Sequence, residues 1–330
     1  MFNISGIELE VGLGCFGGNT FELGDIKFLF CVVCHIVCIF MLVTNKASIP
    51  LKLFTLIFLA ISVISIWYAV LQENHRGRMM IAFLDIGQGD AIYIQAPNGN
   101  DIIIDGGPGR NLLGQLAKVM PFYKRNVGAI LVTNPDADHY SGFIDLLDRY
   151  QVGMDFEAGT ISDTPTRHLF LHKLDDHHIP VMIAKRGMKI VLDQKDGVYL
   201  SILFPDRDVS SFATNDGSII AKLVYGNTSV LLQGDASQKD ELYLLKLDSI
   251  GLKADILKVG HHGSKTSTAP AYVQAVGPEW AIISAGLNNR YGFPHQQTLD
   301  TLNASHVTIL KTMGQGSIIF QSDGREFKEK

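Results

Sequence analysis

The feature that most constrains this chain is the way short apolar runs alternate with turn residues from residue 76 onward. Residues 79–85, 91–96 and 101–105 are predicted strands separated by GQGD and PNGN turns, and 127–133 is a continuous apolar run typical of a buried strand. Strands come in pairs, helices intervene, and the pattern occurs twice. This order favours an α+β fold in which two sheets pack face to face with helices outside.

The remaining elements extend the same pattern. Helical spacing is predicted over 112–120, 141–150 and 238–247, and a hairpin is predicted around Gly226-Asn227. We therefore expect one large domain over 76–330.

Two uncharged apolar runs precede that domain, at 28–43 and 53–71. A helix that spans a membrane needs ~20 apolar residues, so 28–71 is predicted to be a two-helix membrane anchor that follows an N-terminal tail at 1–27. The alternative is a signal peptide followed by a core helix. We expect the chain in the cell inner membrane, and the charges flanking the runs weakly favour the extracytoplasmic side for the soluble domain.

Composition excludes two classes of protein. Hydrophobic residues make up 47% of the chain and the net charge is only −5, so intrinsic disorder is excluded. A basic field over the whole chain is absent too, so binding of nucleic acid would require a local patch or a metal. All four cysteines lie within the first 38 residues, which leaves the predicted soluble domain without thiolate ligands.

The first cluster that can support chemistry follows the predicted strand at 127–133. Asn134, Asp136, Asp138 and His139 lie at its end, where functional side chains often gather. An extended loop would point Asp136 and Asp138 to one side, and two carboxylates beside an imidazole repel each other unless a cation lies between them. The alternative is that Asp138 only caps a following helix.

Two further clusters also end apolar strands. Asp235 follows the strand at 228–233, and the pair His261 and His262 follows the strand at 254–259. Carboxylates and imidazoles are costly to bury unless they are paired or bind a metal. We therefore predict that the three strand ends converge on a dinuclear type of metal site.

Seven segments, in order along the chain, carry a resemblance to a known family. They are FLDIGQGDA at 83–91, IIIDGG at 102–107, NPDADHYSG at 134–142, TNDGSII at 214–220, LLQGD at 231–235, LKVGHHGS at 257–264 and NNRYGFPH at 288–295. Together they resemble the C-terminal metallo-β-lactamase-like domain of the ComEC competence (DNA-uptake) family. The resemblance implies an αββα sandwich with a metal site at its rim and a metal-dependent phosphodiesterase or nuclease activity on DNA.

The resemblance also implies roles for individual residues. Asp136, Asp138 and His139 match metal ligands, Asp235 matches a bridging carboxylate, and His261 is the favoured match for the distal histidine. Further matches are a polar position at Asn215 and Asp216 and a buried structural Asp105. Two positions depart from the family pattern. Asn134 replaces a leading histidine, so its amide oxygen is predicted to be a weak metal ligand there, and Phe293 replaces a histidine before Pro294 and His295.

The ligand chemistry indicates a mechanism. One or two divalent ions, Zn²⁺ or Mn²⁺, would clamp phosphate oxygens and lower the pKa of a water. Asp138 is predicted to orient the nucleophile, and His262 or His295 to protonate the leaving oxygen.

Three functions follow from these observations. The leading one is a membrane-anchored metal-dependent hydrolase of DNA, most simply single-stranded, related to DNA uptake in competence. The second keeps the metal site with a small or lipid-linked phosphodiester as substrate. The third is a degenerate domain, impaired by Asn134 and Phe293, with a scaffold or docking role. Because the chain has room for only two membrane helices, a separate channel subunit is an expected partner.

Overall fold

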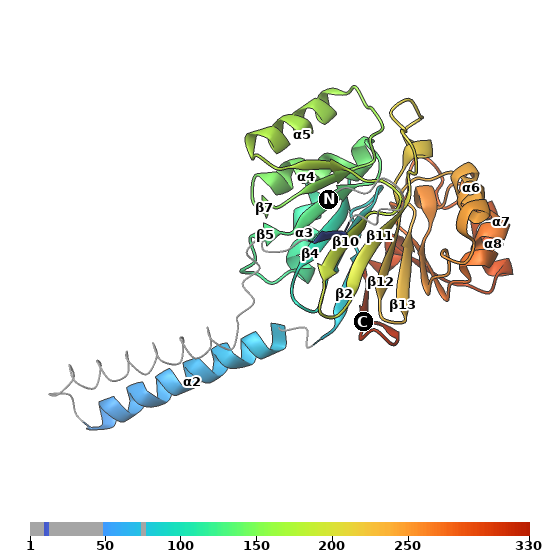
Figure 1. The fold of residues 1–330 in the computed structure, drawn as a ribbon. Helices are drawn as coiled ribbons and strands as arrows, with labels where there is room; N and C mark the ends of the chain where they lie inside the picture. The colour runs from blue at the N-terminus through green and yellow to red at the C-terminus, as the bar shows by residue number, and fades with distance from the viewer. Residues whose placement is uncertain (1–9, 13–48, 74–76) are drawn as a thin grey trace. The chain divides into compact units, whose positions relative to one another are not determined.

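The computed structural model describes residues 10–12, 49–73 and 77–330, which fall into two units. The larger unit contains residues 10–12 and 77–330, and the smaller contains residues 49–73. The larger unit is a sandwich of two sheets with helices on both outer faces (Figure 1).

Sheet A contains eight strands and provides one inner face of the sandwich. The middle strands β10 to β13 are antiparallel, and β13 to β16 are parallel. In spatial order the strands are β1 (Glu10–Gly12), β10 (Lys189–Asp193), β11 (Val198–Phe204), β12 (Ile220–Tyr225), β13 (Thr228–Leu232), β14 (Ile256–Lys258), β15 (Trp280–Ile283) and β16 (Thr308–Lys311).

Sheet B also contains eight strands, and its parallel half begins at β4. A separate two-stranded sheet joins β5 (Asn126–Val127) to β7 (Gln151–Val152). In spatial order the strands of sheet B are β18 (Phe327–Glu329), β17 (Ile318–Ser322), β2 (Met79–Phe83), β3 (Ala91–Gln95), β4 (Asp101–Gly106), β6 (Ala129–Val132), β8 (Asp155–Glu157) and β9 (Val181–Ile183).

Helices cover the outer face of each sheet. One hydrophobic cluster joins sheet B to α3 (Asn111–Val119), α4 (Ala137–Leu147) and α5 (Pro165–Asp176). Another joins sheet A to α6 (Gln238–Asp248), α7 (Pro270–Val276) and α8 (Gln296–Ala304). Shorter elements are the single turns η1 (Asn215–Gly217) and η2 (Gly260–Gly263), and α9 (Thr312–Gln315).

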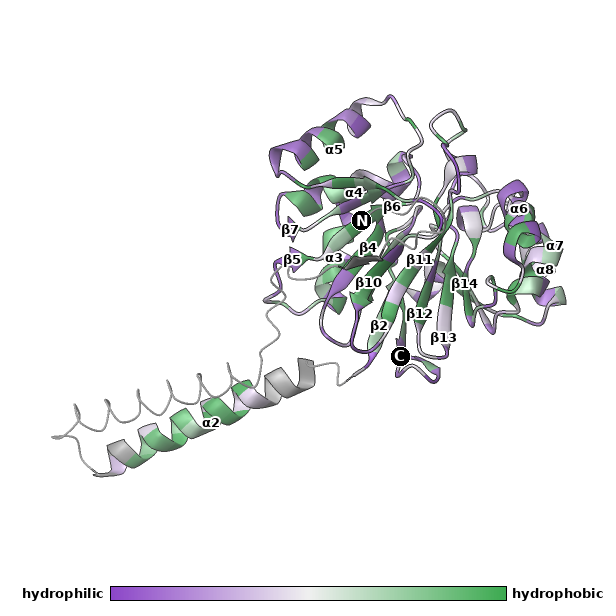
Figure 2. Cartoon of the chain, viewed as in Figure 1, coloured by the Kyte–Doolittle hydropathy of each residue, from purple (hydrophilic) through white to green (hydrophobic). Residues whose placement is uncertain are grey.

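The central core lies between the two sheets. Ile81, Phe83 and Ile94 of sheet B share one buried cluster with Leu200 and Leu223 of sheet A. Strands β2 and β3 are buried at every position, so they are apolar nearly throughout. Figure 2 shows hydrophobic colouring along much of both sheets. The predicted αββα sandwich is confirmed.

The loops that carry the predicted site meet at one edge of the sandwich. Strands β4 and β6 are parallel, as are β13 and β14, so each pair ends at the same edge. Backbone hydrogen bonds tie these ends together, from Ile219 N to Thr133 O at 2.9 Å and from His261 N to Gly234 O at 3.0 Å.

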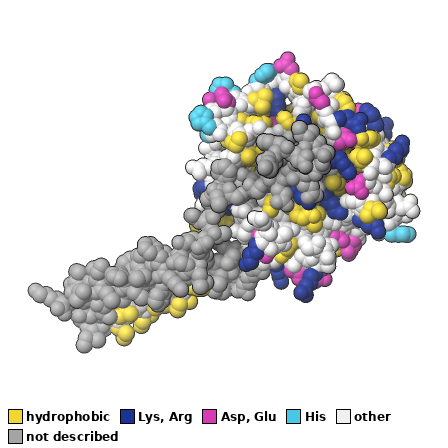
Figure 3. All heavy atoms as spheres, in the orientation of Figure 1, with side chains coloured by type: hydrophobic (Ala, Val, Ile, Leu, Met, Phe, Trp, Pro, Cys, Tyr) yellow, Lys and Arg dark blue, Asp and Glu magenta, His cyan; other side chains and the backbone are white. Residues whose placement is uncertain are grey.

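Helix α2 (Ile49–Glu73) forms the described part of the smaller unit, and it covers the predicted helix at 53–71. Several of its large apolar side chains are exposed, and they are visible in Figure 3. Within residues 10–12, 49–73 and 77–330, no helix has both the length and the apolar character needed to cross a membrane. The other predicted membrane segment, 28–43, lies outside the described residues, so the two-helix anchor stays a prediction.

Candidate metal centre

Helix α4 brings two of the predicted ligands to the site, and it begins earlier than predicted. It starts at Ala137 rather than near residue 141, with Asp136 at the N-cap position. Asp138 and His139 therefore lie in the first helical turn, and the predicted alternation along an extended loop is wrong for them. The helix fits this close because Gly142 packs on the end of β4, where a Cβ atom would lie only 2.0 Å from Gly106 O.

His139 is oriented by a carboxylate behind it. Its Nδ1 atom lies 2.9 Å from Asp105 Oδ2, and both side chains are buried. Asp105 is itself held by Thr133, whose backbone N–H and hydroxyl both donate to it, at 2.8 and 2.6 Å. With Nδ1 facing an acceptor, a neutral His139 ring keeps its proton there and leaves the Nε2 lone pair free toward the site.

His262 is held in the same manner by a second carboxylate. Its Nδ1 atom lies 3.3 Å from Asp90 Oδ1 and 3.1 Å from the carbonyl oxygen of Ser284. Asp90 in turn accepts a 2.8 Å hydrogen bond from Lys258 Nζ, which is fully buried. Each of the two buried histidines is therefore backed by a buried carboxylate, as in metal-binding histidines whose other ring nitrogen is fixed.

Asp235 lies between the two imidazoles. Its Oδ2 atom is 3.2 Å from His139 Nε2, and its Oδ1 atom is 3.5 Å from His262 Nε2. Asp138 Oδ2 lies 3.4 Å from the same His262 nitrogen. Side chains from α4, from the end of β13 and from η2 therefore converge, as the sequence predicted.

The atoms that face one another here make no hydrogen bond within the described part of the chain. His139 Nε2, His262 Nε2 and Asp235 Oδ1 are all buried, and the contacts that join them are the ion-pair distances of 3.2 and 3.5 Å to Asp235. Asp138, His139 and His262 offer ligand atoms within 4.8 Å of one another, as do Asp90, Asp235 and His262. Buried polar atoms are seldom left unsatisfied, and two imidazole nitrogens and a carboxylate oxygen form a donor set that suits a divalent metal.

The electrostatics of the cluster favour positive charge. Burial alone would lower the pKa of both histidines, but Asp235 with Asp105 raises that of His139, and Asp235 with Asp90 raises that of His262 to about 10. Burial alone would raise the pKa of Asp235, yet the two imidazoles lower it. These shifts mean that added positive charge stabilises the cluster. Protons on the two imidazole rings or a bound metal cation would supply that charge.

Three residues of the centre have a backbone that L-amino acids rarely adopt. Asp105 has φ of 58°, and the consecutive residues His261 and His262 have φ of 46° and 54°. Left-handed backbone costs free energy in a residue with a Cβ atom, and it concentrates where side chains must be aimed at a site. The left-handed backbone at His261 and His262, both in η2, directs the His262 side chain toward Asp138 and Asp235.

Asn134, predicted as a ligand, has both polar atoms of its amide engaged by the protein. Its Nδ2 atom donates to Asn215 Oδ1 at 2.7 Å, and its Oδ1 atom accepts from Asp136 N at 3.0 Å. Asp136 Oδ2 accepts a 3.0 Å hydrogen bond from Thr214. Asn134 therefore contacts the N-cap residue of α4, Asp136, through one amide atom and Asn215 through the other. Asp216 faces away from these contacts toward Lys239, at 3.2 Å.

The other predicted residues lie around the rim. His261, favoured from sequence as the distal ligand, is partly exposed, and its Nε2 atom is 3.8 Å from Asp235. The geometry therefore favours His262 over His261 as a ligand, although sequence reasoning assigned His262 to proton transfer. Phe293 packs against both rings, with centroids 5.5 and 6.1 Å away. His295 caps α8, and its Nδ1 atom accepts a hydrogen bond from Lys265 N at 3.0 Å.

Sequence reasoning missed Asp90 and Lys258 as parts of the centre. Asp90 lies in a GQGD segment that has the pattern of an ordinary turn, and Lys258 is the last residue of β14. A lysine inside an apolar strand was the available signal, because lysine is almost never fully buried without a partner.

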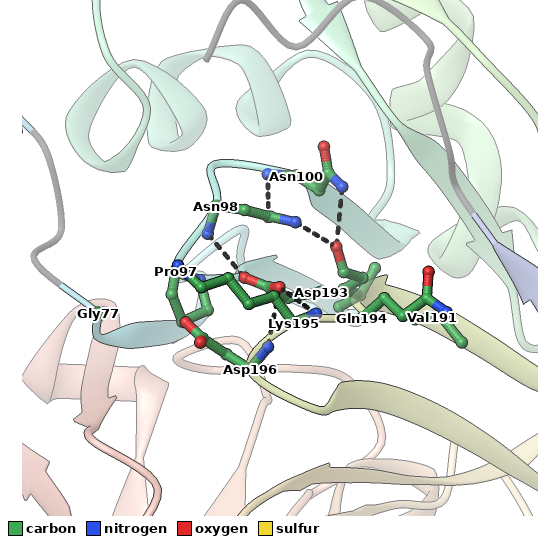
Figure 4. A pocket seen from close by; sticks show the side chains of 10 residues that line it. Gly77, Pro97, Asn98, Asn100, Val191, Asp193, Gln194, Lys195 and Asp196 are labelled. Carbon is green, nitrogen blue, oxygen red and sulfur yellow. Dashed lines mark hydrogen bonds between the residues drawn. The ribbon is translucent and has the colours of Figure 1, made fainter. Parts of the chain in front are cut away.

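A separate pocket of about 540 Å³ lies far from these residues in the fold. It lies between the β3–β4 hairpin and the β10–β11 hairpin, at the opposite ends of the strands (Figure 4). Asn98 and Asn100 both donate to Leu192 O, and Asp193 accepts from the backbone of both hairpins. These polar groups satisfy one another, and none of the predicted site residues lines the pocket.

The chain is similar in sequence to two bacterial proteins. ComE operon protein 3 of Bacillus subtilis is 31% identical over 264 residues, covering 74% of this chain and 33% of that protein. Recombination protein 2 of Haemophilus influenzae is 30% identical over 253 residues, covering 74% of this chain and 29% of that protein. The chain thus matches about a third of the length of these homologues.

One solved structure and a family profile are also similar to this chain. YhfI of Bacillus subtilis, a metallo-beta-lactamase fold protein, is 13% identical with a TM-score of 0.45, over 74% of this chain and 99% of that one. The profile of the Metallo-beta-lactamase superfamily matches residues 84–286. This chain therefore belongs to the metallo-beta-lactamase superfamily and is homologous to proteins of the competence family.

Proposed function

We propose that this chain is a divalent-metal-dependent phosphodiesterase that cleaves DNA strands. One observation carries the proposal: two buried imidazole Nε2 atoms and one Asp235 oxygen face one another without partners, while each ring's other nitrogen is fixed by a carboxylate. A polar cluster that served only to support the fold would satisfy these atoms internally.

The residues that would hold the metal are Asp138, His139, Asp235 and His262, with His261 at the outer side. Mixed nitrogen and oxygen donors without a thiolate suit Zn²⁺ and Mn²⁺ alike. A bound divalent cation supplies a Lewis acid for a phosphoryl oxygen and water of lowered pKa.

Side chains of the protein itself would carry out the proton transfers. Asp138 is the most exposed of the four proposed ligands, with 32% of its side chain accessible, so its carboxylate can accept a proton from an attacking water. His295 accepts at Nδ1 from Lys265 N, so its neutral ring carries the proton on Nε2. From the site rim it can donate that proton to the leaving oxygen.

The names of two homologues support DNA as the substrate. One is Recombination protein 2, and the other is Competence protein ComA of Neisseria gonorrhoeae, which is 24% identical over 239 residues. We also propose that this chain has a separate channel subunit as its partner. The apolar runs at 28–71 would anchor it in the cell inner membrane, with the catalytic domain on the extracytoplasmic side.

The proposal is tested with the full chain loaded with Mn²⁺ or Zn²⁺. Elemental analysis gives the metal content, and labelled single-stranded DNA reports cleavage. We expect Asp138→Ala to lower the cleavage rate at least a hundredfold, whereas Asp163→Ala, an exposed aspartate outside the centre, leaves it unchanged. Metal-loaded chain that cleaves neither DNA nor a simple phosphodiester would refute the proposal.

A second candidate is a degenerate domain that docks a channel partner. It is favoured by one observation, that the amide of Asn134 is fully engaged by Asn215 and the backbone of Asp136. That amide leaves the first metal subsite without a donor at this position. Metal-free chain after expression in metal-rich medium would support this candidate, and cleavage gained by Asn134→His would identify the lost ligand as the cause.

A further inference from the structure

The segment from Gly286 to His295 places a column of rings beside the metal centre. The Tyr291 ring stacks on Phe293 with centroids 5.3 Å apart and planes inclined by 15°. Phe293 then contacts His261 at 5.5 Å, and His261 lies next to Asp235. Tyr291 is therefore only two ring contacts from an imidazole of the centre.

The two rings differ in exposure. Phe293 is 9% exposed and supports the column from below, whereas Tyr291 is 46% exposed. One face of Tyr291 packs on Phe293, which belongs to a buried hydrophobic cluster of the domain, and nearly half of the Tyr291 side chain stays exposed. A large exposed aromatic ring that is already stacked on one side is a ready partner for another planar group.

Asn289 holds this segment in place through its side chain. Its Nδ2 atom donates to Gly286 O at 2.9 Å and to Phe293 O at 2.7 Å. Its Oδ1 atom accepts from Tyr291 N at 3.2 Å and from Phe293 N at 2.9 Å. Four hydrogen bonds that this one amide donates or accepts fix the backbone on both sides of Tyr291, so little conformational freedom remains to be lost when a ligand binds.

Arg290 adds a positive charge at the same place. Its guanidinium donates to the Tyr291 hydroxyl at 2.6 Å and lies 4.8 Å from the Tyr291 ring centroid. Among residues 10–12, 49–73 and 77–330, no carboxylate forms an ion pair with it. The hydrogen bond with Tyr291 and, more weakly, the negative charge of Asp138 raise the pKa of Arg290. The Arg290 guanidinium is therefore attracted electrostatically by a carboxylate of the metal centre.

We propose that Tyr291 and Arg290 form a subsite for one unpaired nucleotide next to the scissile phosphodiester, with the base stacked on Tyr291 and a phosphate on Arg290. This inference rests on the proposed function and narrows its substrate to single strands. A base in a duplex is stacked on its neighbours and cannot reach the ring, whereas an unpaired base can.

The charge distribution agrees with a local subsite rather than a long basic groove. Basic and acidic side chains are interspersed on the face seen in Figure 3, and the chain is acidic overall. Long polyanions gain affinity from many phosphate contacts, and a chain with 28 basic against 33 acidic residues has no excess of basic side chains to make them. Stacking contributes about 1–3 kcal/mol per base regardless of sequence, so one exposed ring can supply much of the affinity.

The test compares two labelled strands of equal length, an oligothymidylate and an abasic strand with the same phosphates but no bases. Binding to the full chain is measured by fluorescence anisotropy in EDTA, so that no cleavage interferes. We expect the oligothymidylate to bind about tenfold more tightly than the abasic strand. Tyr291→Leu should remove that difference, Tyr291→Phe should keep it, and Arg290→Gln should weaken both strands alike.

Tyr123→Leu is the matched control, because Tyr123 is a similarly exposed tyrosine that precedes β5 and β6, whereas the centre follows the end of β6. It should leave the preference for bases unchanged. Equal affinity for the two strands, or a preference that survives Tyr291→Leu, would overturn the subsite. Since binding is measured without metal, failure of the subsite is distinguishable from failure of the proposed hydrolase, which shows as absent cleavage of a simple phosphodiester.

Discussion

Replacing Lys258 by methionine tests how the metal centre is supported. Lys258 is fully buried, and its Nζ atom donates to Asp90 at 2.8 Å and to Val259 O at 3.0 Å. Methionine keeps much of the apolar stem but removes the charge. The carboxylate of Asp90, itself 1% exposed, then loses its nearest cation while still facing His262.

The size of the effect follows from this burial. Leaving one member of a buried ion pair uncompensated costs about 3–5 kcal/mol of the free energy of unfolding. For a domain of this size that lowers Tm by roughly 6–20 °C, at about 2–4 °C per kcal/mol.

The loss of stability in Lys258→Met should also depend on pH. Burial alone would raise the pKa of Asp90, but the charges of Lys258 and His262 lower it to about 2. Without Lys258 the pKa of Asp90 rises, and its carboxyl takes up a proton more readily in the folded state than in the unfolded one. The variant should therefore recover part of its lost stability at mildly acidic pH.

Urea denaturation of the full chain, followed by circular dichroism at neutral and mildly acidic pH, measures these changes. The double variant Asp90→Asn/Lys258→Met should be much more stable than Lys258→Met alone, because no charge is then left unpaired. Lys195→Met, at an exposed lysine, is the control. A loss in Lys258→Met no larger than in this control would refute the reasoning.

Three further predictions concern single residues. Asn134→Ala should cost about 1–3 kcal/mol of unfolding free energy without changing metal content, because it leaves Asp136 N and Asn215 Oδ1 without partners; an altered metal content would contradict this. Asp105→Asn should weaken metal binding about 10–100-fold in calorimetric titration, since Asp105 orients His139; unchanged affinity would count against it. Burial raises the pKa of Asp240 to about 6, so the folded chain holds that proton more tightly and loses stability as pH rises from about 4 to 6; Asp240→Asn should therefore gain in Tm relative to wild type above about pH 6, and parallel melting curves would refute this.

Local patterns in the sequence predicted the layers of the fold well. Strands buried on both faces have few polar residues, so runs such as 91–96 and 127–133 mark them directly. Polar residues directly after those strands predicted where the site lies, because parallel strands end at a common edge.

Finer features of the centre could not be predicted from local pattern. Asp90 lies in an ordinary turn pattern, and its partner Lys258 is 168 positions away. At the start of α4, Asp136 is held by its neighbour Asn134 and also by Thr214, which is 78 positions away and is brought there only by tertiary packing. Both kinds of feature depend on atoms brought together from distant parts of the chain.

The sequence by itself determined the architecture of this protein and the chemical types of group at its rim, since burial and periodicity are written in neighbouring residues. The tertiary structure alone decided which of these side chains face the metal centre and which face away from it. Two adjacent histidines have the same chemistry, and only the left-handed backbone at η2, imposed by packing against Asp90 and Ser284, aims His262 inward and leaves His261 at the edge.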